Sequence, residues 1–126
     1  MKLIPRACLV LSLLWCVALA SIAVDAEAAE LTFNLRIEGG HVPENMRLVR
    51  VTEGDVVHLR WTVDRPAILH LHGYDIEKRV EPGVVGEMKF TARITGRFPV
   101  HAHPIGAGAA QAHDEATLLY VEVYPR

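Results

Sequence analysis

The chain has 126 residues, a length that predicts a single domain. Its 13 lysines and arginines against 15 aspartates and glutamates give a formal net charge of −2, which offers no reason to expect a nucleic-acid partner. The two cysteines, Cys8 and Cys16, lie near the N-terminus, whereas the seven histidines lie between His41 and His113.

The N-terminal segment has the layout of a secretory signal peptide. Lys2 and Arg6 precede an apolar run from about Ala7 to Ala20, and small-residue cleavage sites follow, the last ending at Ala28. The run is shorter than the roughly 20 residues that a membrane-spanning helix needs. We therefore predict a signal peptide over residues 1–28, export to the periplasm or the medium, and no stable membrane insertion after cleavage.

Cleavage there removes both cysteines from the mature domain, residues 29–126. That domain then has no disulfide, no thiolate metal ligand and no cysteine nucleophile. It retains all seven histidines, which is a conspicuous excess for a chain of this size.

The residue pattern of the mature chain predicts a series of β-strands. In LTFNLRI, residues 31–37, every second residue is apolar, which is typical of a half-buried strand. The same reasoning predicts further strands at about 46–51, 55–63, 67–74, 87–92, 98–103 and 117–124, with loops at 78–86 and 104–115. About seven short strands separated by turns predict an all-β sandwich or barrel.

Two H-x-H pairs contain most of the candidate metal ligands. His70 and His72 lie in ILHLHGYDIE, His101 and His103 lie in FPVHAHP, and His113 follows the second pair. Residues i and i+2 of a strand face the same side, about 6.5–7 Å apart, so each pair presents two imidazoles together. Neutral imidazole suits copper, zinc, nickel or iron. We predict a metal site formed by these five histidines.

Leu69 and Leu71 alternate with the first histidine pair, so one face of that strand belongs to the core. The histidine face is then either the outer surface of the sheet or a polar end of the core. The alternative to a metal site is a set of hydrogen-bonded histidines, with Asp75, Asp114 or Glu115 as their acceptors.

Other candidate ligands are weaker. His41 lies in a glycine-rich loop, and His58 lies in a strand pattern. Met46 and Met88 also lie in strand patterns that predict core positions. Asp75 is a candidate acceptor for a ring N–H of a ligating histidine. The sequence contains no Ser/His/Asp motif or phosphate-binding loop that would indicate an enzyme.

Residues 31–126 resemble a small cupredoxin-like domain. The segments that carry the resemblance are GDVVHLRWTV, LHLHGYDIE, EMKFTARITGRFPVHAH and TLLYVEVY. The resemblance implies a Greek-key β-sandwich that binds copper with His70 or His72 from the earlier strand and with further ligands from the loop before the last strand. Where a blue-copper protein has its thiolate, this sequence has His101-Ala102-His103.

A blue electron-transfer site needs that thiolate. The resemblance therefore implies copper binding for storage, delivery or tolerance, with zinc as the other candidate metal. We expect a binding protein, not an enzyme, whose partners are the metal ion and a periplasmic copper-handling protein.

Two alternatives remain. His70, His72 and Glu77 fit the H-x-H-x4-E pattern of a cupin, a barrel that often houses a metal-dependent enzyme. Against it, Asp64 stands where a cupin has glycine, and Phe98-Pro99-Val100 replaces the P-x-G turn. The other alternative is a metal-free β-sandwich that serves as an interaction module.

Overall fold

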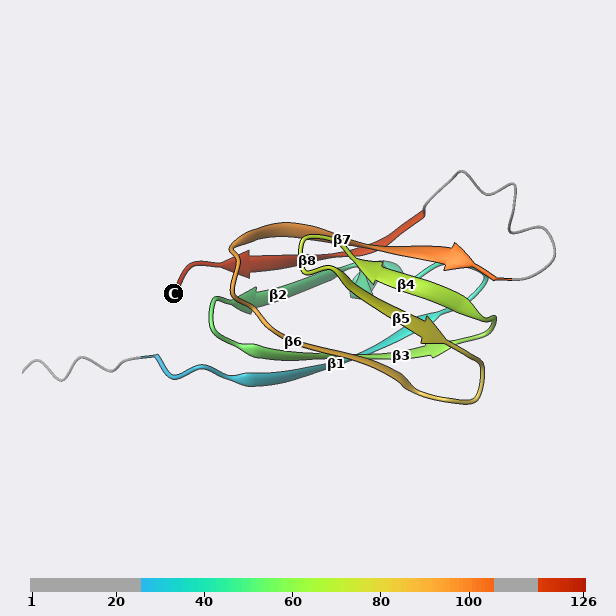
Figure 1. Cartoon of the computed structure of the whole chain (residues 1–126), viewed down its shortest axis with the longest axis horizontal. Helices are drawn as coiled ribbons and strands as arrows, with labels where there is room; N and C mark the ends of the chain where they lie inside the picture. The colour runs from blue at the N-terminus through green and yellow to red at the C-terminus, as the bar shows by residue number, and fades with distance from the viewer. Residues whose placement is uncertain (1–25, 106–115) are drawn as a thin grey trace, which may run out of the picture.

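The computed structural model describes residues 26–105 and 116–126, which form two facing β-sheets (Figure 1). The smaller sheet has the order β1 (Glu30–Ile37), β3 (Val56–Val63), β6 (Gly86–Thr91). The larger sheet has the order β2 (Leu48–Thr52), β8 (Ala116–Tyr124), β7 (Gly96–Pro104), β4 (Ala67–Leu71), β5 (Ile76–Val80). A short 3-10 turn, Glu44–Met46, precedes β2. In the described part of the chain, no helix is long and apolar enough to cross a membrane.

The core fills the space between the sheets. Leu59 and Trp61 enter it from β3, Leu69 and Leu71 from β4, and Val121 from β8, and all five are fully buried. Each alternates with residues that face outward, as the period of two in a strand requires. Burying a side chain of this size contributes about 1.5–3 kcal/mol, so this alternation fixes which face of each strand points inward.

The predicted all-β sandwich is confirmed. A cupin barrel is not the fold, because β1 pairs with β3 and β2 with β8 in parallel, whereas the jelly roll of a cupin is antiparallel. The prediction was wrong between residues 67 and 86. The strand expected over 67–74 ends at Leu71, and residues 76–80, partly assigned to a loop, form β5. β5 lies at the edge of its sheet and exposes Glu77, Lys78 and Arg79, so it lacks the apolar alternation that marks a half-buried strand.

A tight turn over residues 72–75 ends β4. Gly73 has φ +84°, and a Cβ built on it would lie 2.3 Å from the Phe98 ring. The Tyr74 hydroxyl donates to the Ile94 carbonyl (2.8 Å) and accepts from the Ile94 N–H (3.0 Å). Asp75 follows with φ 55°. The turn is thus held against β7 and against the connection between β6 and β7.

His58 links the three strands of the smaller sheet. Its Nε2 lies 2.7 Å from Glu30 Oε1 in β1, and its Nδ1 is hydrogen-bonded to the Glu87 carboxylate in β6. Carboxylates only accept hydrogen bonds, so both contacts form only when the ring is an imidazolium. The hydrogen bonds to Glu87 and then to Glu30 raise the pKa of His58, opposed by burial and by Lys89. The same contacts lower the pKa of both glutamates.

This link predicts a loss of stability on the alkaline side. Because the pKa of His58 is raised above its ordinary 6.5, its contribution is complete below that value and disappears as the pH rises through the higher folded pKa. The free energy of unfolding, measured in urea across this range, is expected to fall in the wild type and to stay flatter in His58→Gln. His41→Gln, at an exposed turn position, is the matched control. An NMR titration that puts the pKa of His58 at or below its ordinary value would contradict the link.

The geometry of the turn predicts that substitution of Gly73 destabilises the fold more than substitution of another glycine with positive φ. We expect Gly73→Ala to lower the free energy of unfolding by about 3 kcal/mol, because it combines a left-handed backbone with overlap on the Phe98 ring. Gly83→Ala is the control, because Gly83 has φ +79° but nothing within 4 Å of the added methyl group, and should cost only about 1 kcal/mol. Equal losses in urea denaturation would show that the Phe98 contact is unimportant.

Candidate metal centre

The histidines of β4 lie on the outer face of the larger sheet. Leu69 and Leu71 are both 0% exposed and point into the core, which places His70 between them on the opposite face. The sequence left open whether the histidines lie on the outer surface of the sheet or at a polar end of the core. In the structure, His70 lies on the outer surface. The side chain of His70 is nonetheless only 19% exposed, because neighbouring side chains cover it.

Three imidazoles meet there. His70 and His101 are directly opposite each other in the antiparallel pairing of β4 with β7. His72, whose N–H donates to the Pro99 carbonyl (3.0 Å), lies between them. Its ring centroid is 4.0 Å from that of His70 and 4.5 Å from that of His101. We call His70, His72 and His101 the imidazole cluster.

The environment of His70 differs from that of His101. His101 Nε2 lies 3.0 Å from the Thr117 hydroxyl, within hydrogen-bond distance. His70 Nε2 is buried and has no hydrogen-bond partner among the described residues, and its nearest acidic oxygen is Asp75 Oδ1 at 3.5 Å. Leaving a buried polar atom without a hydrogen bond costs about 1–3 kcal/mol, so a metal ion bound to this nitrogen would offset that cost.

An irregularity in the neighbouring strand brings Thr117 to the cluster. The pairing of β7 with β8 shifts between Val100, which faces Leu119, and His101, which faces Thr117. The extra residue, Leu118, is buried together with Leu119. The bulge therefore lies in β8, and β7 keeps its alternation, so His101 and His103 share the outer face. The sequence alone did not settle this point.

The other two predicted ligands are placed differently. His103 lies two residues beyond His101 on the same face, opposite Ile68 of β4. His113 lies outside the described residues. Across residues 26–105 and 116–126, no three His, Cys, Asp or Glu side chains already converge on one ion position. Metal binding to the imidazole cluster would therefore require rotation of the rings that now contact one another.

The donors available here are nitrogen and oxygen. Cysteine is absent from the described residues. Met88 is buried in the core, as expected, and Met46 packs against the core. Neither methionine is in a strand of the larger sheet. Two nitrogens bound to one ion at about 2.0–2.1 Å lie no more than about 4 Å apart, a separation that rings already in contact can reach. The donor chemistry of the cluster thus fits a metal that accepts imidazole.

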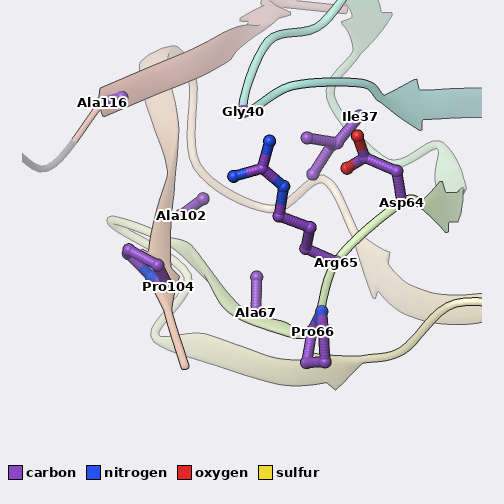
Figure 2. Close-up of a pocket in the computed structure, with 9 residues that line it drawn as sticks. All are labelled: Ile37, Gly40, Asp64, Arg65, Pro66, Ala67, Ala102, Pro104 and Ala116. Carbon is purple, nitrogen blue, oxygen red and sulfur yellow. The ribbon is translucent and has the colours of Figure 1, made fainter. Parts of the chain in front are cut away.

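A cavity of about 150 Å³ lies elsewhere (Figure 2). Its lining residues are Ile37, Gly40, Asp64, Arg65, Pro66, Ala67, Ala102, Pro104 and Ala116. Among them, Asp64 is the one with a metal-binding side chain, and its Oδ2 accepts a hydrogen bond from the Gly39 N–H (2.7 Å). Ala102 lies between His101 and His103 in β7 and so faces the opposite side of the sheet. The cavity is therefore separate from the imidazole cluster.

No protein-family model matches the chain, and no curated protein does. Solved structures do. A multicopper oxidase matches with a TM-score of 0.58 at 22% identity, over 79% of this chain and 40% of that one. The copper nitrite reductase of Nitrosomonas europaea matches with a TM-score of 0.57 at 21% identity, over 77% of this chain and 42% of that one.

A copper-containing nitrite reductase from Thermus scotoductus matches with a TM-score of 0.57 at 24% identity, over 79% of this chain and 28% of its own length. The chain spans less than half the length of each of these three proteins. At such identities the likeness concerns the fold. The chain adopts a cupredoxin-like β-sandwich, as the resemblance in its sequence implied.

Proposed function

We propose that this chain is an exported copper-binding protein that holds Cu(II) on the imidazole cluster and serves in copper storage, delivery or tolerance. The observation that carries the proposal is the contact of three imidazoles from β4, β7 and the turn after β4, next to a buried nitrogen of His70 that has no hydrogen bond within the described chain. Export follows from the predicted signal peptide over residues 1–28.

Two considerations favour copper. The solved structures that share the fold are named as copper enzymes. Moreover, a nitrogen and oxygen site binds Cu(II) more tightly than the other divalent first-row metals, Zn(II) included. The absence of sulfur donors near the cluster favours Cu(II) over Cu(I), which soft thiolate and thioether ligands select. Zinc is the metal against which copper must be tested.

Binding is proposed here in place of electron transfer or catalysis. A blue-copper centre depends on a cysteine thiolate in its ligand set, and the described residues contain none. In the proposed site, His70, His72 and His101 would hold the ion, and copper would supply the Lewis acidity that binds imidazole. The partners are then the metal ion and a periplasmic protein that delivers or receives it.

The site predicts loss of copper when its histidines are removed. In the mature protein, residues 29–126, purified after export, we expect one Cu(II) per molecule by elemental analysis, and preference for copper in a competition with equimolar Zn(II). His70→Ala/His72→Ala should weaken Cu(II) binding by at least about 100-fold in a chelator competition, because removal of even an outer-shell partner of a metal ligand typically costs 10–100-fold.

His41→Ala serves as the control, since His41 lies in an exposed turn bridged to Glu38. It should bind copper as the wild type does. A wild-type protein without copper would overturn the proposal, and so would equal copper content in the wild type and the double variant. An intense thiolate-to-copper absorption band in the visible range would overturn the ligand set.

A further inference from the structure

We propose that Asp75 supplies a carboxylate ligand to the ion bound by the imidazole cluster, so that the site is a mixed one of three imidazoles and one carboxylate. This inference rests on the proposed function and names a ligand for that site. Its starting point is the Asp75 carboxylate, which lies 3.5 Å from the buried nitrogen of His70 and is the one acidic group that forms an ion pair with it among the described residues.

The distance between these two atoms is longer than a hydrogen bond and compatible with a shared ion. At 3.5 Å, His70 Nε2 has no hydrogen-bond partner, and side-chain hydrogen bonds usually join atoms 2.7–3.2 Å apart. A nitrogen at about 2.05 Å and a carboxylate oxygen at about 2.1 Å from one Cu(II) ion lie about 2.9 Å apart when they occupy adjacent positions of the tetragonal geometry that Cu(II) prefers. The observed separation is about 0.6 Å longer than that value, a difference that rotation of the exposed Asp75 side chain can close.

The turn after β4 holds Asp75 in this position. Among the described residues other than glycine, Asp75 alone has a positive φ, of 55°. That backbone conformation costs a residue with a side chain roughly 1–2 kcal/mol, although aspartate tolerates it better than most. Gly73 against Phe98 and the Tyr74 hydroxyl on Ile94 fix the residues before it. A strained position that is fixed by its surroundings is often found at a functional site.

The Asp75 carboxylate is otherwise uncommitted. Its side chain is 99% exposed, and within the described chain it has no second ion pair and no hydrogen bond. An exposed carboxylate next to a half-buried imidazole places the ion at the surface of the sheet. Such a position suits a protein that exchanges metal with a partner.

Glu77 is the matched control. It lies directly opposite His70 in the pairing of β4 with β5, on the same face of the sheet. It carries the same charge as Asp75, and among the described residues it forms no ion pair with His70. A general effect of negative charge on copper affinity would appear equally at Glu77 and at Asp75, whereas ligation would appear only at Asp75.

The first test compares the Cu(II) affinities of the mature protein and its variants by chelator competition. Asp75→Asn and Asp75→Ala are expected to weaken Cu(II) binding by about 10–100-fold, and Glu77→Gln by less than about 3-fold. Equal effects at the two positions, or no effect at Asp75, would overturn the inference. Asp75→Asn, which tolerates the same left-handed backbone, should give the unfolding curve of the wild type in the absence of metal, so that its loss of affinity is not a loss of fold.

The second test detects metal ligation at position 75 directly, by absorption spectroscopy. Asp75→Cys places a thiol where the carboxylate lies, and a thiol that coordinates a metal ion is deprotonated. With Co(II) as a probe that thiols do not reduce, Asp75→Cys should gain an intense near-ultraviolet thiolate-to-metal absorption, and Glu77→Cys should not. If the wild type binds copper and loses it on His70→Ala/His72→Ala, but Asp75→Cys shows no such band, only the carboxylate ligand is overturned. If the wild type binds no copper, the proposed function fails as well.

Discussion

The alternation of inward and outward residues in β4 and β7 is the constraint on which the candidate site depends. Leu69 and Leu71 are fully buried, and their burial leaves His70 on the other face of the sheet. Val100 does the same for His101 in the neighbouring strand. Moving either strand by one residue would place an imidazole in the core and a leucine or valine in water, at a cost of several kcal/mol. The core therefore sets the geometry of the imidazoles.

Two local irregularities of the backbone, a turn after β4 and a bulge in β8, complete the geometry of the imidazole cluster. The turn at Gly73 stops β4 just after Leu71, which lets the His72 ring lie against both His70 and His101. The bulge at Leu118 turns Thr117 toward His101. Both irregularities are anchored in the core, one by Phe98 and the other by Leu118 itself. The cluster is thus built on strands and pinned turns, which place side chains more precisely than long loops do.

The sequence predicted those parts that follow from strand periodicity. The strand over 31–37 was found because every second residue is apolar, and the strand over 117–124 because it is rich in apolar, β-branched and aromatic residues. β5 was missed because an exposed edge strand has no such pattern. The ligand candidates followed from the H-x-H spacing, but the bulge in β8 and the position of Asp75 depend on contacts between distant segments. His58, predicted to be a weak ligand candidate, forms an ion-paired link instead, because its partners Glu30 and Glu87 come from other strands.

X-ray absorption at the copper edge of the copper-bound mature protein, which lacks Cys8 and Cys16 after cleavage of the signal peptide, tests the central claim most directly, because it reports the atoms around the ion without reference to any variant. The account predicts nitrogen and oxygen neighbours at about 2.0 Å, with the outer-shell scattering of three imidazole rings and no sulfur. A sulfur neighbour, or the scattering of a single imidazole, would contradict the claim that His70, His72 and His101 together hold the metal.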